Sequence, residues 1–118
     1  ASRSGIALIM ADYVPDEGDI IWLNFTPQSG HEQAGHRPAV VLSPAAYNRI
    51  GLLLCCPLTT KSKGYPFEVM VDGKTKSFVL ADQVKSLDWK SRGAKRKGCV
   101  SETELSCIRA KARALIGK

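Results

Sequence analysis

A β-rich fold is first indicated by the run Asp19-Ile20-Ile21-Trp22-Leu23-Asn24-Phe25, whose β-branched and aromatic residues are typical of a strand. A second strand is predicted at Arg37–Leu42, where Ala39-Val40-Val41-Leu42 is too apolar for an exposed edge. Between the two runs lies the polar segment His31-Glu32-Gln33-Ala34-Gly35-His36. Because such loops are where catalytic and binding groups collect, we expect this strand–loop–strand unit to carry functional side chains.

Further short strands are predicted along the rest of the chain. They are expected at Leu52–Leu58, Phe67–Val71, Phe78–Leu80, Val84–Leu87 and Gly98–Val100. Asp72-Gly73 is a strong hairpin signal between the strand that ends at Val71 and the strand near Phe78. Ser43-Pro44 supplies an N-cap and a first-turn proline for a brief helix that ends at Tyr47 or Arg49.

A longer helix is predicted at the end of the chain. Ser101-Glu102-Thr103-Glu104 is a capping box, in which the serine and the second glutamate satisfy each other's backbone amides. Apolar residues then recur at helical spacing up to Gly117, at Leu105, Ile108, Ala112, Leu115 and Ile116. Many short strands and one terminal amphipathic helix indicate an α+β, mainly β fold, built as a small barrel.

A chain of 118 residues has room for one hydrophobic core, so we expect a single domain over residues 13–118. Residues 1–12 are set aside, because Ala1-Ser2-Arg3-Ser4-Gly5 resembles a cloning scar and Met10 could be the natural start; a disordered extension is the alternative. No apolar run reaches the roughly 18–20 residues of a bilayer span. We expect a cytoplasmic protein without a membrane segment or an export signal.

The cysteines predict reduced thiols rather than a metal site. Cys55, Cys56, Cys99 and Cys107 form no Cys-x-x-Cys pair and have no histidines at zinc spacing, so no metal and no cofactor are expected. Cys55 and Cys56 adjoin within an apolar run, where successive side chains of a strand point to opposite faces and cysteine acts as a small hydrophobic residue.

The positive charge of the chain favours polyanionic partners, since the formal net charge is +6. Six basic residues stand against the single acid Asp88 in one segment, with Trp89 among them: Lys85, Lys90, Arg92, Lys95, Arg96 and Lys97. Cations interleaved with an aromatic ring suit the phosphates and bases of single-stranded nucleic acid. A basic loop that is merely solvated is an equally good interpretation.

Arg37 is the first candidate for chemistry. It begins an otherwise apolar strand, so its guanidinium must emerge at the rim of the barrel, where it could bind a phosphate through two hydrogen bonds. An ion pair with Glu32 or Asp82 that holds the fold is the alternative. His31 and Glu32 precede Arg37 in the same loop and could accept a proton from a ribose 2′-hydroxyl, or could simply be solvated.

Two further polar segments follow strands. Thr59-Thr60 ends the third strand, and such threonines usually bond to nearby backbone. The functional alternative is a hydroxyl aimed at a phosphate, with Lys61 and Lys63 as clamps on a nucleic-acid backbone. Asp82-Gln83 interrupts an apolar stretch, and embedded polar side chains need partners. Support of the site is the favoured role for this pair, and reading of a base edge is the alternative.

These three segments, His31–Pro38, Pro57–Thr60 and Ala81–Val84, closely resemble the motifs of the MazF/PemK family of toxin endoribonucleases, and the resemblance runs from about Tyr13 to Gly117. It implies an SH3-like barrel that forms a homodimer. It further implies sequence-specific, metal-independent cleavage of single-stranded mRNA that leaves 2′,3′-cyclic phosphate and 5′-hydroxyl ends and inhibits translation. The implied partner is a cognate antitoxin whose acidic, disordered C-terminal segment covers the RNA groove.

The family pattern assigns site residues, and the implied catalytic group is Arg37, Thr59 and Glu32. The PemK-like branch also uses a histidine and an aspartate, which fall on His31 and Asp82, but the arginine that this branch has two residues before the aspartate is Leu80 here. This departure favours MazF-type chemistry and leaves the role of His31 open.

RNA contacts are expected around this group, at His36, Thr60, Lys61, Lys63, Lys85, Lys95 and Arg96. The same barrel is used by CcdB-like toxins, which bind DNA gyrase and catalyse nothing, so a shared fold alone does not decide the function. A gyrase poison of that kind and a non-catalytic RNA-binding module are the two alternatives to the ribonuclease.

Overall fold

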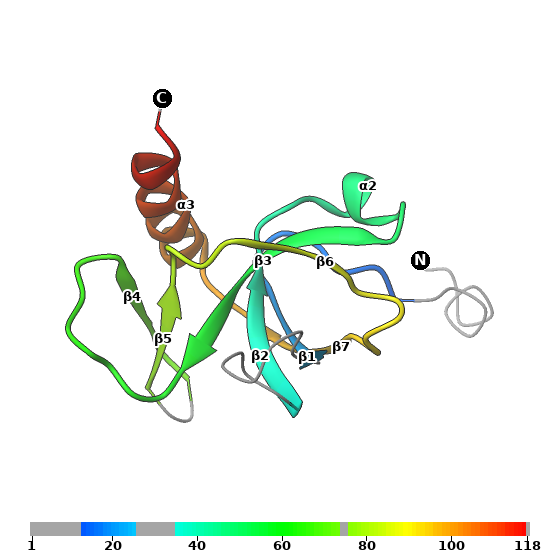
Figure 1. Cartoon of the computed structure of the whole chain (residues 1–118), viewed down its shortest axis with the longest axis horizontal. Helices are drawn as coiled ribbons and strands as arrows, with labels where there is room; N and C mark the ends of the chain where they lie inside the picture. Colours follow the sequence, from blue (N-terminus) through cyan, green and yellow to red (C-terminus); the bar gives the residue numbers. More distant parts are fainter. Residues whose placement is uncertain (1–12, 26–34, 74–75, 118) are drawn as a thin grey trace.

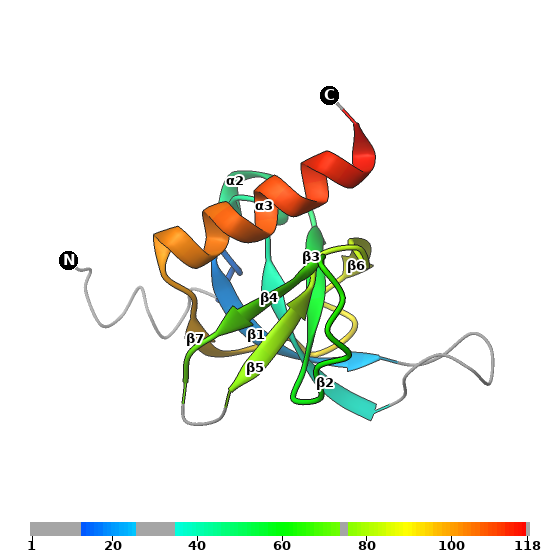
Figure 2. The same ribbon diagram turned by 90° about the vertical axis from the view of Figure 1, so that its left-hand side faces the viewer.

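The computed structural model describes residues 13–25, 35–73 and 76–117, and in these ranges a curled antiparallel sheet is covered by a long helix (Figures 1 and 2). The predicted N-terminal extension and the catalytic loop residues His31 and Glu32 lie outside the described residues. The elements are β1 (Asp19–Phe25), β2 (Gly35–Val41), α2 (Ala45–Asn48), β3 (Leu52–Thr59), β4 (Glu68–Val71), β5 (Ser77–Leu80), β6 (Lys85–Asp88), β7 (Lys95–Cys99) and α3 (Glu102–Ile116). No helix in these ranges is long and apolar enough to cross a membrane.

The strands run in the order β4-β5-β3-β2-β1-β7, and β6 also pairs with β3. β3 therefore has β2 along one edge and both β6 and β5 along the other, in ladders that are all antiparallel. The predicted strands are confirmed, and the hairpin signal at Asp72-Gly73 does join β4 to β5. The last strand is longer than predicted, because the basic residues Lys95 and Arg96 pair with Trp22 and Ile21 of β1.

Two apolar clusters lie on opposite faces of this sheet. Core 1, under α3, contains Val40, Cys56, Leu58, Val69, Val71, Val79, Ala81, Val100 and Ile108. Core 2, on the other face, contains Ile21, Leu23, Ala39, Val41, Leu53, Cys55 and Trp89. The adjacent thiols of β3 thus point into different cores, as the alternation of a strand predicts, and all four cysteines are free.

The terminal helix begins at the predicted capping box, in which the amide of Glu104 donates to the Ser101 hydroxyl and the Glu104 carboxylate accepts from the Ser101 amide. Ile108 of α3 is completely buried in core 1. The burial of this side chain contributes roughly 1.5–3 kcal/mol to stability. Arg109 donates to the carbonyl of Leu42 at 2.7 Å and pairs with Glu17. Figure 2 shows α3 lying across the sheet, where these contacts fix it.

The short helix α2 forms where predicted, but the prediction that Ser43 is its N-cap is wrong. Pro44 occupies the N-cap position and makes no side-chain bond. The amide of Ala45 instead donates to the carboxylate of Asp16 at 2.9 Å, so a distant residue supplies the cap. The Ser43 hydroxyl is committed elsewhere, because it donates to Oδ1 of Asn48 at 2.6 Å.

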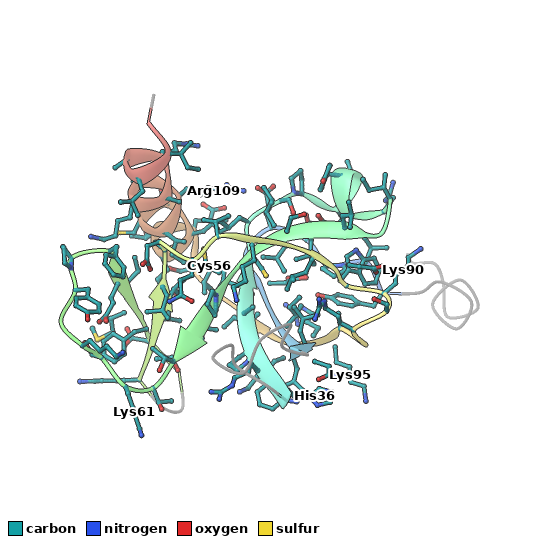
Figure 3. The ribbon with its side chains drawn as sticks, viewed as in Figure 1. His36, Cys56, Lys61, Lys90, Lys95 and Arg109 are labelled. Carbon is teal, nitrogen blue, oxygen red and sulfur yellow. The ribbon has the colours of Figure 1, made fainter. Side chains whose placement is uncertain are left out.

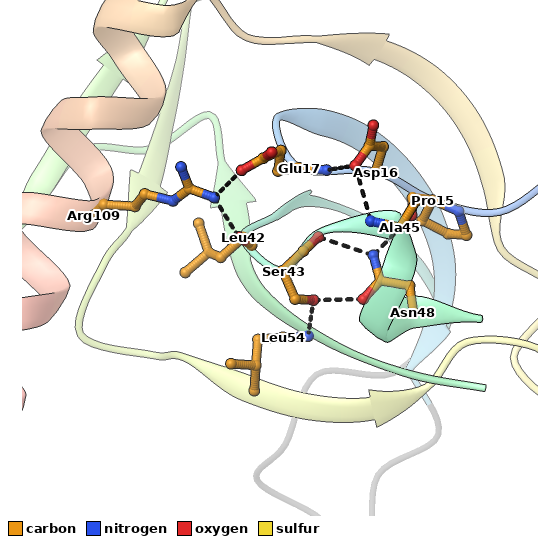
Figure 4. A network of polar contacts seen from close by, with 9 residues as sticks. All are labelled: Pro15, Asp16, Glu17, Leu42, Ser43, Ala45, Asn48, Leu54 and Arg109. Atoms are coloured by element: carbon orange, nitrogen blue, oxygen red, sulfur yellow. Dashed lines mark hydrogen bonds and ion pairs between the residues drawn. The ribbon is translucent and has the colours of Figure 1, made fainter. Parts of the chain in front are cut away.

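Asn48 is a buried polar hub, with no exposed surface (Figure 4). Its Nδ2 donates to the carbonyls of Pro15 at 2.7 Å and Ser43 at 2.9 Å. Its backbone carbonyl accepts from the indole N–H of Trp89 at 2.8 Å. Asn48 thereby links three parts of the chain: Pro15 before β1, Ser43 after β2, and Trp89 of core 2. Every polar atom of its side chain has a hydrogen-bond partner.

Asn48→Ala should lower the free energy of unfolding by about 3 kcal/mol, because it leaves the buried groups of Pro15 and Ser43 without partners. Urea denaturation at 25 °C measures this loss. Asn24→Ala is the matched control, since Asn24 is partly exposed and the contacts found for it in the described ranges are made by its backbone. A loss below about 1 kcal/mol for Asn48→Ala would contradict the assigned role.

Candidate active site at the end of core 2

Arg37 at the start of β2 and Thr59 at the end of β3 both lie beyond the pairing of these two strands. The antiparallel register of β2 with β3 runs from Val41–Cys55 to Ala39–Pro57, whereas Arg37 pairs with Leu23 of β1. Residues that face each other across an antiparallel pair point to the same side of the sheet. Arg37 is therefore exposed on the core 2 face, which contains Leu23, and Thr59 is partly exposed where β3 ends.

Two more cations lie near core 2. Lys85 pairs with Cys55 in the β3–β6 register, so its side chain leaves the sheet on the core 2 face. Burial raises the pKa of Cys55 to about 12, while the charges of Lys85 and Arg92 act on this pKa in the opposite direction. We call Arg37 and Arg92 the cationic end, because Arg37 pairs with Leu23 of β1 and Arg92 binds the carbonyl of the next residue, Asn24.

Arg92 comes from the loop between β6 and β7 and is fixed to β1. Its Nη1 donates to the carbonyl of Asn24 at 3.1 Å, and the amide of Asn24 donates to the carbonyl of Arg92 at 3.2 Å. The Nε of Arg92 is buried and has no hydrogen-bond partner. The sequence placed Arg92 in the basic cluster but not at the site, because only the fold brings its loop beside β1.

The hydroxyl of Thr59 accepts a hydrogen bond from the amide of Lys61 at 3.2 Å, which is the turn contact expected as the alternative to a functional role. A hydroxyl that accepts keeps its own proton free to donate, so the two roles are compatible. The following segment is held by Glu68, whose pKa is lowered by bonds from the Ser62 hydroxyl at 2.6 Å and the Lys63 amide at 3.0 Å. The exposed side chains of this segment include Thr60, Lys61 and Lys63.

The prediction that Asp82 and Gln83 are embedded among apolar residues is wrong. Both are exposed, because β5 ends at Leu80 and the chain turns there, with the amide of Gln83 donating to the Leu80 carbonyl at 3.0 Å. Burial and then the charge of Asp82 raise the pKa of Cys56 to about 12, so Asp82 lies toward core 1. Among the described residues no carboxylate pairs with Arg37, which leaves the fold-holding Arg37–Asp82 pair without support.

The prediction that Trp89 offers an aromatic ring to RNA is also wrong. Trp89 is 5% exposed and closes core 2, so a base cannot stack on it. The basic cluster is not one loop either, since Lys85 belongs to β6 and Lys95–Lys97 belong to β7. Arg96 is partly neutralised, because its Nε lies 3.4 Å from a carboxylate oxygen of Asp19.

An exposed ring near this cluster is Trp22, which alternates along β1 with the buried residues Ile21 and Leu23. It stacks on the imidazole of His36, with ring centroids 6.4 Å apart and an angle of 18° between the planes. The Nζ of Lys97 lies 4.8 Å from the centroid of the Trp22 ring. The alternation of residues along the strand indicates that Trp22 points away from core 2, but it does not predict the contacts of Trp22 with His36 and Lys97.

The predicted RNA contacts His36, Lys61 and Lys95 lie along one edge of the molecule, the lower edge in Figure 3. The structure thus puts Arg37 and Lys85 on the core 2 face, leaves Thr59 partly exposed at the end of β3 and exposes Asp82 beyond β5. The catalytic roles of Arg37 and Thr59 stay predictions, as do those of His31 and Glu32.

Comparison with known proteins finds one family along nearly the whole chain. A family model described as the PemK-like, MazF-like toxin of type II toxin-antitoxin system matches residues 16–116. The endoribonuclease toxin MazF of Escherichia coli (strain K12) is 58% identical over 111 residues, covering 92% of this chain and 100% of that protein. The endoribonuclease PemK of Escherichia coli is 37% identical over 95 residues, covering 75% of this chain and 71% of that protein.

Solved structures give the same result. The crystal structure of MazF (Form-I) from Deinococcus radiodurans matches with a TM-score of 0.84 at 52% identity, covering 91% of this chain and 100% of that chain. A chain of the MazE-MazF structure (Form-II) from the same organism matches with a TM-score of 0.82 at 52% identity, covering 90% and 98%. The predicted fold class is confirmed. As the sequence resemblance predicted, the chain belongs to the family of PemK-like, MazF-like toxins of type II toxin-antitoxin systems.

Proposed function

We propose that this protein is a sequence-specific endoribonuclease that cleaves single-stranded mRNA in the cytoplasm without a metal ion, and so inhibits translation as the toxin of a toxin–antitoxin pair. The observation that carries the proposal is the cationic end, where the exposed Arg37 and the bound Arg92 lie at the same end of β1. The relatives named endoribonuclease MazF and endoribonuclease PemK support it. The chain is an RNA-cleaving enzyme of the MazF type.

In the proposed reaction the 2′-oxygen of a ribose attacks the adjacent phosphorus, and the bond from phosphorus to the 5′-oxygen breaks. Glu32 takes the proton of the 2′-hydroxyl as general base, and the leaving 5′-oxygen gains a proton. The products are a 2′,3′-cyclic phosphate and a 5′-hydroxyl end. Negative charge that builds on the phosphoryl oxygens is met by the guanidinium of Arg37, whose planar donors match a phosphate.

Thr59 orients the phosphate rather than moving a proton. Its hydroxyl accepts from the amide of Lys61, which fixes the oxygen and leaves the proton to donate to a phosphoryl oxygen. Lys85 adds positive potential on the core 2 face of the sheet. His31 serves as a supporting group in the same loop.

Single-stranded RNA is the substrate because unpaired bases expose edges that a protein can read. The exposed residues His36, Thr60, Lys61, Lys63 and Lys95 hold its phosphates and bases, together with Lys85 and Arg96. Since Asp82 and Gln83 are exposed, contact with a base edge is the better supported of the two roles predicted for them.

The partners proposed for the toxin are a cognate antitoxin and a second copy of the chain. Solved MazE-MazF structures of Deinococcus radiodurans match this chain, which supports an antitoxin complex. The net charge of +6 suits an acidic, disordered antitoxin segment that competes with RNA for the same residues. A homodimer would bury exposed apolar residues such as Ile50, which is 66% exposed. Size-exclusion chromatography with light scattering tests the dimer.

Cleavage of a long RNA should persist in excess EDTA and leave 2′,3′-cyclic phosphate ends, because the 2′-hydroxyl of the substrate is the nucleophile and Arg37 supplies the positive charge. Mapping the ends of the fragments by ligation and mass spectrometry measures this outcome. Activity that EDTA abolishes and magnesium restores would overturn the mechanism. Retention of RNA without any cleavage would instead indicate a non-catalytic binding module.

Arg37→Ala should reduce the single-turnover rate by roughly 10²–10³-fold, because it removes a positioned charge from the transition state. Thr59→Val keeps the β-branched shape and should also lower the rate, with little change in melting temperature. Arg49→Ala is the matched control, since Arg49 is an exposed arginine directly after α2, away from the start of β2 and the end of β3.

The competing explanation for Arg37 is a purely structural ion pair in the native toxin. It expects Arg37→Ala to lose stability and activity together and Arg37→Lys to restore both. A stable Arg37→Ala protein that cleaves at a near-normal rate would remove Arg37 from the site. Thermal melts of all variants accompany the kinetic measurements so that the two explanations are separated.

A further inference from the structure

The stack of Trp22 on His36 is an exposed aromatic site that the cleavage chemistry does not use. Trp22 is 37% exposed although its neighbours in β1 are buried, and His36 is exposed at the start of β2. The ring centroids are 6.4 Å apart and the planes are tilted by 18°, which is a stacked arrangement. The two rings are therefore nearly parallel, and the exposed imidazole has surface available to another ring.

The charges around this stack favour a nucleic-acid ligand. Lys97 places its Nζ 4.8 Å from the centroid of the Trp22 ring, and Lys95 is the residue opposite Trp22 in the β1–β7 register. The β1–β7 register shifts between Ile20 and Ile21, and Lys97 is the extra residue of this β-bulge. Lys95 and Lys97 thus both lie near Trp22. Aromatic rings flanked by cations are how proteins hold single-stranded nucleic acid.

The stack is adjacent to the cationic end. His36 and Arg37 are consecutive in β2, so their side chains leave opposite faces of the same strand only one residue apart. Both lie at the beginning of β2, where each is exposed. An RNA strand that crosses this end of the sheet with its cleaved phosphate at Arg37 brings a flanking nucleotide to His36.

We propose that one unpaired base of the RNA, flanking the cleaved phosphate, stacks on His36, that Trp22 holds the imidazole in position, and that Lys95 and Lys97 bind the neighbouring phosphates. The proposal rests on the proposed function and names a base-binding subsite for it. His36 touches the substrate, whereas Trp22 is a positioning residue. Stacking is tolerant of base identity, so this subsite anchors the RNA and leaves sequence reading to other groups.

The test uses a short RNA that contains a mapped cleavage site, with a 2′-deoxy nucleotide at the attacking position so that it binds without being cut. Fluorescence anisotropy should show binding weakened roughly 5- to 100-fold for His36→Ala and Trp22→Leu, the range found for loss of one base stack. Trp22→Phe should lose less, because it keeps a ring behind the imidazole. Tyr47→Leu is the matched control, since Tyr47 is 41% exposed on α2.

A second measurement distinguishes stacking from loss of structure. Replacing one flanking nucleotide at a time by an abasic residue should weaken binding to the wild type at one position. At that position the same replacement should cost nothing further in Trp22→Leu or His36→Ala. Abasic effects that are equal in wild type and variants would overturn the proposal, as would wild-type affinity in His36→Ala.

The outcome for the subsite is separable from the outcome for the proposed function. Wild-type protein that neither binds nor cuts RNA contradicts the proposed function itself. Wild-type cleavage together with unchanged binding by the variants contradicts the subsite alone. Single-turnover rates at saturating RNA should be near normal in the control Tyr47→Leu, and the exposed His36→Ala variant decides the matter if Trp22→Leu proves unstable in thermal melts.

Discussion

From Cys55 to Leu58 the strand β3 is buried on both faces, and it is paired along both edges, so it constrains everything around it. Cys55 faces core 2 and Cys56 faces core 1, each without exposed surface. β2 pairs with one edge of the strand, and β6 and β5 share the other. A strand held on four sides has a single register, since a slip of one residue would exchange the two cores. The position of Thr59, two residues beyond the last pair of β3 with β2, follows from that register.

Most of the fold could be predicted from local sequence. Strand alternation, the Asp72-Gly73 turn and the capping box of α3 are short-range patterns, and each forms where expected. What could not be predicted were contacts between distant residues. Ser43 looks like an N-cap, but the α2 cap comes from Asp16, 29 residues from its partner Ala45. Locally sound signals were overridden because a buried Asn48 needed the Ser43 hydroxyl as a partner.

The places of Arg37 and Thr59 could be predicted from the sequence, because each marks the end of a predicted strand, while their catalytic roles stay predictions. Loop positions were less predictable. Trp89 and Asp82 were misread for opposite reasons. Their neighbours suggested an exposed ring and an embedded carboxylate, whereas the turns around them bury the one and expose the other. The nearness of Lys97 to Trp22 could not be predicted, because it depends on which residue of β7 pairs with Trp22.

The adjacent buried thiols of β3, Cys55 and Cys56, can also be used to measure how often the sheet opens. Alkylating reagents attack thiolates, and burial raises the pKa of both Cys55 and Cys56 to about 12, so neither reacts while the sheet is closed. Cys99 and Cys107 are exposed and mark the native state. The slow alkylation rate of Cys55 and Cys56 therefore measures how fast β3 separates from its neighbours. A bound antitoxin or RNA that stabilises the closed sheet would lower this rate without contacting either sulfur.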